Sequence, residues 1–202
     1  MVAKGKFIVF EGIDGSGKST QSQLLYEYML RNGYNCILTN EPTKTETGKF
    51  IRSNLSDFKL DAYAMQLFFT ADRANHVSKI IQPALESGTN VICDRYMQST
   101  FTYGVLTDLP ENRLAALHAA NKPFPNPDLT LLFDIDPRNA FLNRRGNLDS
   151  FEKKDFSDKD RMRKVYLELC DADENCMKID GYQSVEAVHA IVVKEVLKLL
   201  RE

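Results

Sequence analysis

Apolar residues of the chain gather in short runs, and longer stretches of mixed polarity separate them. The runs are KFIVFE (6–11), NCILTN (35–40), NVICDR (90–95) and LTLLFDI (129–135), with a weaker fifth, CMKID, at 176–180. Continuous apolar runs of this length are typical of strands in a parallel sheet that is covered on both faces. The pattern therefore predicts four buried strands and a weaker fifth.

The stretches between these runs show helical spacing. Residues 18–31 place four side chains at core-facing positions, Leu24, Leu25, Tyr28 and Met29, and NGY ends that helix. A longer pattern covers 61–87, where Pro83 is expected to divide or kink the helix. Residues 184–201 have the pattern of an amphipathic helix whose apolar side includes Val185, Val188, Val192 and Val196. Strands that alternate with helices predict βαβ units and an α/β fold.

The segment 143–156, NRRGNLDSFEKKDF, is charged and carries little apolar area, so we expect a mobile flap there. A chain of 202 residues suits one domain with a small mobile insertion. We therefore predict a single domain over 1–202.

The charge balance excludes some classes of partner. With 26 Lys and Arg against 28 Asp and Glu, the net charge is −2, whereas proteins that bind nucleic acids or membranes usually show a basic excess. No stretch approaches the roughly 18 apolar residues of a membrane span, and the N-terminal apolar run is too short for a signal peptide. We expect a soluble cytoplasmic protein whose anion site is local, with neither a nucleic-acid nor a membrane partner.

The four cysteines, Cys36, Cys93, Cys170 and Cys176, form no CxxC pair, and Cys36 and Cys93 lie in strand-like runs. We expect buried, reduced thiols. Zinc ligation and disulfides are the alternatives.

The most specific motif follows the first apolar run. The pattern Gly12-x-x-x-x-Gly17-Lys18-Ser19 is that of a P-loop, and it has the required strand before it and helix after it. Glycines let backbone N–H groups approach phosphate oxygens, and the helix N-terminus adds its positive end. Lys18 would contact the β- and γ-phosphates, and Ser19 would ligate Mg²⁺. The predicted nucleoside triphosphate site comprises Gly12, Ile13, Asp14, Gly15, Ser16, Gly17, Lys18, Ser19 and Thr20.

Two further features carry possible chemistry. Asp94 and Arg95 follow a strand run, where a parallel sheet exposes its carboxyl end to ligands, so they suit a magnesium ion and a phosphate. A strand-end salt bridge is the alternative. Phe69 and Arg73 are four residues apart on one helix face, which would suit a planar, hydrogen-bonding ligand, although ordinary packing beside a surface charge explains the pair as well.

These pieces occur in the order found in thymidylate kinases, and the sequence resembles that family over nearly its whole length. The matching stretches are FEGIDGSGKST (10–20), EPT…GKFIR (41–52), LFFTADRANHV (67–77), VICDRYMQSTFTY (91–103), PDLTLLFDIDP (127–137) and IDGYQSVEAV (179–188). The resemblance implies a P-loop nucleoside monophosphate kinase fold, with a five-stranded parallel sheet and a small lid at about 143–156, and a homodimer. It also implies transfer of the γ-phosphoryl group of ATP to dTMP, with Mg²⁺ as cofactor.

The same resemblance assigns roles to single residues. Phe69 would stack on thymine, Arg73 would bond the base O4, and Thr100 would also contact the base. Tyr103 would crowd the sugar 2′ position, and Asp14 would hold the 3′-hydroxyl or magnesium side of dTMP. Arg95 would bind the dTMP phosphate. Pro42 matches a proline that is often cis in the family, and residues 180–184 would contact adenine. The substrate site implied in this way comprises Asp14, Glu41, Pro42, Phe69, Arg73, Arg95, Ser99, Thr100 and Tyr103.

The catalytic cations come from two places in this interpretation. Lys18 and Arg95 supply two, and the lid supplies Arg144 and Arg145, because the P-loop position where some relatives carry arginine is Gly15 here. One lid arginine would act on the phosphates and the other would stack on adenine, in an order that the sequence leaves open. A solvated basic turn is the alternative. The metal ligands expected are Ser19, Asp94 and Asp14.

Other functions remain as alternatives. One is a kinase acting on dUMP or on a wider set of pyrimidine monophosphates, since one methyl group is worth only about 1–3 kcal/mol of discrimination. A deoxynucleoside kinase would need a general base, for which Glu41 is the candidate, because His76, His118 and His189 are scattered and look like surface or core-edge residues. A P-loop binding module without this activity belongs to a different class.

Overall fold

The computed structural model describes residues 4–55, 60–142 and 156–201. Its centre is a parallel sheet of five strands in the order β2-β3-β1-β4-β5. The strands are β1 (Phe7–Glu11), β2 (Cys36–Asn40), β3 (Asn90–Asp94), β4 (Leu129–Asp134) and β5 (Cys176–Asp180). The α/β fold and all five strands predicted from the apolar runs are confirmed to within one residue at each end. The predicted burial is wrong for the edge strand β2, which is half-buried at four of its five positions.

The strand order places a topological switch point at β1. From β1 the chain goes to the edge strand β2, returns to β3 beside β1, and then crosses to β4 on the other side of β1. In open parallel sheets, ligands bind outside the carboxyl ends of the strands at such a point. The P-loop begins where β1 ends, so the fold puts it in that position.

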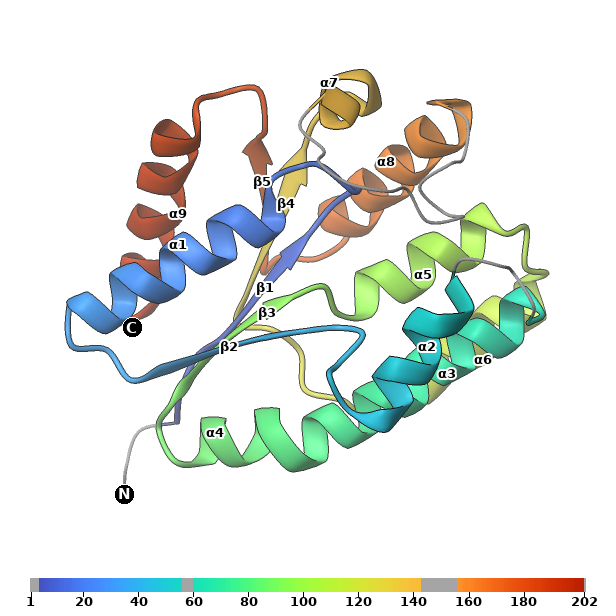
Figure 1. The fold of residues 1–202 in the computed structure, drawn as a ribbon, viewed down its shortest axis with the longest axis horizontal. Coiled ribbons are helices and arrows are strands. Elements are labelled where there is room, and N and C mark those ends of the chain that lie inside the picture. Colours follow the sequence, from blue (N-terminus) through green and yellow to red (C-terminus); the bar gives the residue numbers. More distant parts are fainter. Residues whose placement is uncertain (1–3, 56–59, 143–155, 202) are drawn as a thin grey trace.

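Helices cover both faces of this sheet, as Figure 1 shows. On one face, Ile8 and Phe10 of β1 pack with Leu25 and Met29 of α1 (Lys18–Arg31) and with Val192 of α9 (Val185–Leu199). On the other face, alternate strand residues pack against the long helical segment described next. Burial on both faces explains the continuous apolar runs.

The predicted face of each outer helix needs a correction. In α1, Leu25 and Met29 are buried and half-buried Tyr28 packs against the same core, so the correction concerns Leu24, which is half-buried outside that cluster. In α9 the buried side begins at Val188, because Val185 is 48% exposed.

The long helical segment of 61–87 consists of α3 (Ala62–His76), the π-helical turn η1 (Val77–Ile81) and α4 (Gln82–Glu86). The Asp61 side chain caps its start by accepting from the backbone N–H groups of residues 63 and 64. Pro83 lacks an N–H and crowds the carbonyl group four residues earlier. The wide π turn lies directly before it, so Pro83 disturbs the segment as expected without ending the helix.

The remaining helices are α2 (Glu46–Leu55), α5 (Met97–Leu106), α6 (Glu111–Asn121), α7 (Pro137–Leu142) and α8 (Phe156–Asp171). The lid predicted at 143–156 lies outside the described residues except for Phe156, which begins α8. Within the described ranges, no helix combines the length and apolar character that crossing a membrane requires.

The cysteine prediction is confirmed for one pair and wrong for the other. Cys36 and Cys93 are free and buried, and burial raises the pKa of both thiols. Cys170 and Cys176 form a disulfide between the end of α8 and the start of β5. The two residues are six positions apart along the chain, but the turn between helix and strand brings their Cα atoms to 5.1 Å. Sequence spacing alone does not reveal that turn.

Candidate active site

The loop between β1 and α1 adopts backbone angles that suit glycine. Gly12, Gly15 and Gly17 have φ values of 138°, 83° and 99°. A Cβ atom on Gly12 would lie 2.7 Å from the carbonyl oxygen of Phe133 in β4. This conformation opens a cavity of about 790 Å³, which we call the nucleotide cavity, lined by residues 14–21 and by Gly181, Gln183, Ser184 and Val185. The structure thus brings most of the predicted triphosphate site together with the predicted adenine loop.

Lys18 lies in the wall of the nucleotide cavity and is 4% exposed. Its Nζ donates to the carbonyl oxygen of Ile13 at 2.7 Å, and Ile13 itself is packed into the core next to Leu132. Burial, together with the charge of Arg95, lowers the pKa of Lys18 to about 8. An anionic ligand in the cavity would favour the charged form of this amine.

Ser19, an exposed residue that lines the nucleotide cavity, meets Asp94 in a neighbouring hollow. The Ser19 hydroxyl donates to Asp94 Oδ2 at 2.5 Å, and Asp94 Oδ1 is buried without a hydrogen-bond partner in the described part of the chain. Among the described residues no group of three His, Cys, Asp or Glu side chains forms a metal cluster. Mg²⁺ does not require one, since it is typically held by one or two carboxylates, a hydroxyl, waters and substrate phosphates. This donor set therefore fits Mg²⁺ bound together with a nucleotide.

Arg95 stands at the junction between two cavities. It has a left-handed φ of 72°, and its guanidinium pairs with Asp14. It also donates to the Ser99 hydroxyl at 3.2 Å and to the Tyr166 hydroxyl at 3.3 Å. A backbone conformation that costs energy for a non-glycine residue, held by several side chains, is often found at functional sites.

The second cavity of this junction, the base cavity, has a volume of about 280 Å³. It is lined by all nine substrate residues that the resemblance implied, namely Asp14, Glu41, Pro42, Phe69, Arg73, Arg95, Ser99, Thr100 and Tyr103. The peptide bond between Glu41 and Pro42 is cis. The Tyr103 hydroxyl lies 3.3 Å from Asp14 Oδ2. Residues that follow β1, β2 and β3 and residues of α2, α3 and α5 thus converge on one pocket.

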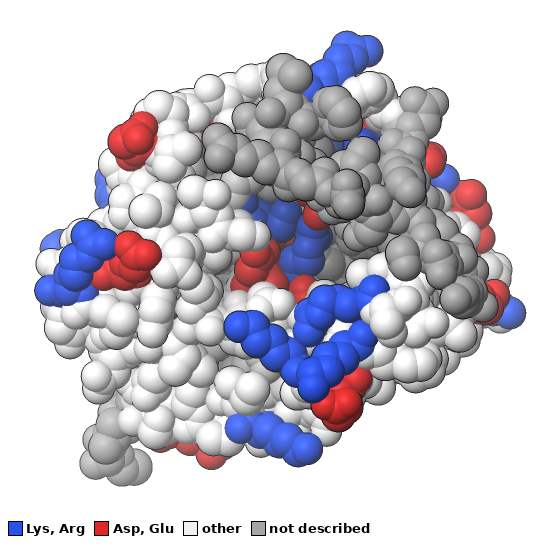
Figure 2. Space-filling view, in the orientation of Figure 1, with Lys and Arg blue, Asp and Glu red and all other residues white. Residues whose placement is uncertain are grey.

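The face of the molecule drawn in Figure 2 is hollowed near its middle, and Lys or Arg side chains and Asp or Glu side chains lie together in that hollow. The nucleotide cavity and the base cavity share two residues, Asp14 and Arg95.

Arg73 is a buried residue here and not a surface charge. It is 1% exposed and makes five side-chain hydrogen bonds, two to Glu41, one each to Thr100 and Asn121, and one to the Tyr96 carbonyl oxygen. A guanidinium has five N–H groups, so each has a protein acceptor. A bond from Arg73 to a base would have to share one of them.

Glu41 also contacts a histidine. His76 is fully buried, with Nδ1 3.0 Å from Glu41 Oε1 and Nε2 2.7 Å from the Thr39 hydroxyl. The expectation that His76 lies at the surface or at the edge of the core is therefore wrong. A lone histidine in the sequence carries no sign of its partners.

Several residues of the site were missed by sequence reasoning. Lys44 lines a hollow beside Ser19, Asp94 and Arg95, and Arg52 and Gln66 line the base cavity. Buried Asp72 accepts from the backbone N–H and the hydroxyl of Thr43 at 2.7 Å, which ties the loop after Pro42 to α3. Gln66 could have been found, because it is three residues before Phe69 and seven before Arg73 on the same helix face.

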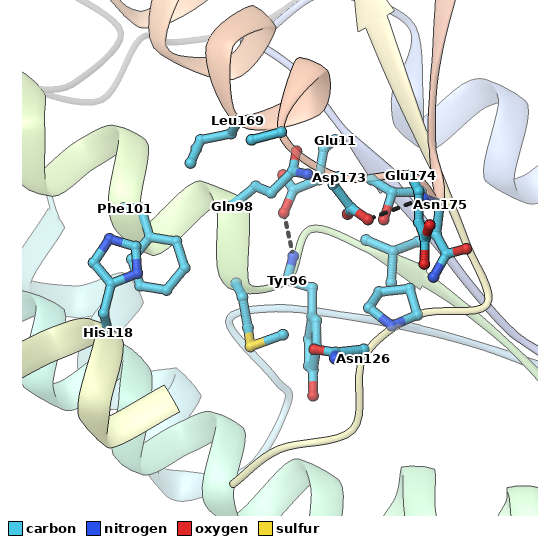
Figure 3. A pocket seen from close by; sticks show the side chains of 15 residues that line it. Glu11, Tyr96, Gln98, Phe101, His118, Asn126, Leu169, Asp173, Glu174 and Asn175 are labelled. Atoms are coloured by element: carbon cyan, nitrogen blue, oxygen red, sulfur yellow. Dashed lines mark hydrogen bonds between the residues drawn. The ribbon is translucent and has the colours of Figure 1, made fainter. Parts of the chain in front are cut away.

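A separate cavity of about 510 Å³ lies on the face of the sheet opposite to α1 and α9. Figure 3 shows it from close by, with Phe101 and His118 at one side and Asp173, Glu174 and Asn175 at the other. It contains none of the predicted site residues. The Gln98 oxygen and the Tyr96 hydroxyl, from two of its lining residues, are buried without hydrogen-bond partners in the described part of the chain.

Comparison with known proteins agrees with this geometry. The model of the thymidylate kinase family matches residues 10–192. The chain is 40% identical to a probable thymidylate kinase of Pyrococcus abyssi over 94% of this chain and 95% of the relative. It is 37% identical to a thymidylate kinase of Caldicellulosiruptor saccharolyticus over 98% and 99% of the two chains. A third similar protein is a thymidylate kinase of Caldanaerobacter subterraneus, at 36% identity over 98% of each chain. With its P-loop, its cis-proline pocket and these matches over nearly its full length, the chain belongs to the thymidylate kinase family.

Proposed function

We propose that this protein transfers the γ-phosphoryl group of ATP to dTMP, giving ADP and dTDP. The observation that carries the proposal is the junction of the two cavities, because the P-loop cavity and the base cavity meet at Asp14 and Arg95. A triphosphate in one cavity and a nucleoside monophosphate in the other would face each other there. Such positioning can supply much of the rate enhancement in phosphoryl transfer.

The cations around the junction suit this chemistry. Lys18 would contact the β- and γ-phosphates, and Arg95 would hold the acceptor phosphate with support from Ser99 and Tyr166. Ser19 and Asp94 would hold Mg²⁺, which neutralises charge on the transferring group when it is bound. Asp14 would be a further Mg²⁺ ligand or would contact the sugar of dTMP. Arg144 and Arg145, the proposed lid cations, lie outside the described residues.

The acceptor needs no strong general base, which favours a monophosphate over a nucleoside. A phosphate monoester has a second pKa of about 6, so its oxygen is already anionic near neutral pH. Glu41, the candidate base for a deoxynucleoside kinase, is 4% exposed and bound to Arg73 and His76. It is therefore committed to a structural ion pair.

A coupled ADP-release assay with each deoxynucleoside monophosphate in turn tests the proposal. We expect ADP release with dTMP that depends on Mg²⁺ and fails in the Lys18→Ala variant. Equal rates with dTMP and dUMP would favour the broader pyrimidine kinase. Nucleotide binding without ADP release on any acceptor would favour the P-loop binding module and overturn the proposal.

We also infer a cytoplasmic homodimer. Polar atoms of Gln98 and Tyr96 beside the separate cavity of Figure 3 have no hydrogen-bond partner among the described residues. Buried polar atoms are usually paired, which supports the packing of a second protein surface against this cavity. A second copy of the chain is the partner that the family resemblance implies. Light scattering at assay concentrations tests this inference, and a single species of about 23 kDa would overturn it.

A further inference from the structure

One side-chain amide of the base cavity, that of Gln66, has no hydrogen-bond partner among the described residues. Gln66 of α3 is 1% exposed and lines the cavity, and its amide oxygen and nitrogen make no hydrogen bond to any described residue. The two amide atoms are not among the fully buried, unpartnered side-chain atoms of the described residues, so they are accessible from the cavity. A cavity wall is a place where a ligand can supply the missing partner.

The neighbours of Gln66 place it beside the expected base. Gln66, Phe69 and Arg73 occupy positions i, i+3 and i+7 of α3, and all three line the same cavity. Helical side chains lean towards the helix N-terminus, so the Phe69 ring extends over the turn that carries Gln66. A planar base stacked on Phe69 would present its edge near the Gln66 amide.

The other polar groups near Gln66 have fewer hydrogen-bonding positions left for a ligand. All five N–H groups of Arg73 have acceptors within the protein. The Thr100 oxygen already accepts from Arg73 at 3.0 Å, which leaves its hydroxyl hydrogen for one further bond. Gln66 is the amide in this wall that can both donate and accept.

The thymine edge matches an amide of this kind. Its N3–H is a donor, and the adjacent O4 is an acceptor, so Gln66 Oε1 can accept from N3–H while Nε2 donates to O4. We propose that Gln66 reads the N3–O4 edge of the pyrimidine and is a specificity-determining residue for the acceptor base. This inference rests on the proposed function. An amide can also rotate by about 180° and so match the reversed order of donor and acceptor on the cytosine edge. Gln66 therefore discriminates against a base whose N3–O4 edge is blocked, and it does not discriminate between thymine and cytosine.

The test compares two acceptors, dTMP and dTMP methylated at N3, in the wild type and in Gln66→Met. Methionine keeps the length of the side chain and removes both hydrogen bonds. We expect the kcat/KM for dTMP to fall about tenfold, mainly through KM, because two net hydrogen bonds are lost. The N3-methyl analogue cannot form the N3 bond, so its kcat/KM should change much less. Gln82→Met, whose amide bonds exposed Glu86 further along the same helical segment, is the matched control and should change neither value.

The ratio of the kcat/KM for dTMP to the kcat/KM for the N3-methyl analogue decides the outcome. A ratio that collapses in Gln66→Met and is retained in Gln82→Met supports the inference. Equal losses for both acceptors, or an unchanged ratio, would mean that Gln66 only supports the helix, and would overturn it while dTMP kinase activity stands. A wild type that releases no ADP with dTMP overturns the proposed function and the inference with it. If Gln66→Met melts below the assay temperature, Gln66→Asn withdraws the amide by one methylene and should lower the same ratio.

Discussion

The nucleotide cavity and the base cavity are built in different ways. The nucleotide cavity is formed mainly by one contiguous stretch, residues 14–21. The base cavity collects side chains from five separate segments, and its charged members bind one another before any ligand arrives. Ligand binding and stability are therefore separable in the first cavity and linked in the second.

The largest effect should come from breaking the buried ion pair of the base cavity. Glu41→Ala leaves Arg73 without its carboxylate at a site where both side chains are nearly fully buried. Removing one partner of such a pair typically costs about 3–5 kcal/mol of stability. Urea unfolding measures the loss. Glu46→Ala, which removes an exposed ion pair with Lys49, is the control and should unfold like the wild type. A stable Glu41→Ala protein would separate binding from stability in this cavity too.

The two cavities also differ in how well the sequence predicts them. Gly12, Lys18 and Ser19 are readable because their roles follow from spacing and local backbone geometry. Phe69, Arg73 and Tyr103 were placed in the pocket by resemblance, but the burial of Arg73 and its bonds to Asn121 and Glu41 depend on segments that meet only in the fold.

The features of the fold that the sequence did not predict also depend on contacts or turns that form only in the folded chain. Strands appear as apolar runs because burial on both faces leaves a local signature. The Cys170–Cys176 pair depends on the turn between α8 and β5, and the π turn before Pro83 depends on how the helix accommodates a missing N–H.

In the nucleotide cavity, Lys18→Ala should abolish most turnover and leave the fold intact. Removing one preorganised positive group from a phosphoryl-transfer site is expected to lower kcat by roughly a hundred- to a thousandfold. The buried amine holds only a backbone carbonyl and a neighbouring hydroxyl in the described structure, so its loss should not lower the melting temperature much. A coupled ADP-release assay measures the loss of kcat, and a thermal melt checks that the fold is intact. Unchanged kcat in a folded variant would remove Lys18 from the site.

At the junction, Arg95→Ala should separate the two ligands. The loss of a charge-assisted bond to an enclosed phosphate costs about 1.5–3 kcal/mol, so kcat/KM for dTMP should fall by about 10- to 150-fold. The affinity for ATP should stay close to that of the wild type, which calorimetry with a non-hydrolysable analogue measures. Equal losses for both ligands would place Arg95 in the donor site.

The pKa of Lys18 gives the nucleotide cavity a pH dependence of its own. Burial and the charge of Arg95 lower this pKa to about 8 in the unliganded protein, and the protonated amine is the form that binds phosphate. The kcat/KM for ATP should therefore fall as pH rises through 8, by about tenfold at one unit above the pKa. The kcat measured at saturating ATP should begin to fall only at higher pH, because bound phosphate favours the charged amine. Coincident profiles for the two parameters would contradict this account.

The smallest effect should appear in the sugar preference of the base cavity, which we attribute to Tyr103. Its ring lines the cavity, and its hydroxyl lies 3.3 Å from Asp14, the residue expected on the sugar side of dTMP. Tyr103 and Thr100 are at i and i+3 of α5, so they share the face that borders the pocket. An aromatic ring at that place leaves no room for a 2′-hydroxyl group. Tyr103→Ala should therefore raise the kcat/KM of the ribose analogue relative to that of dTMP by several-fold. If both values fall together and their ratio stays the same, Tyr103 only supports α5, and the selection of deoxyribose lies with other residues.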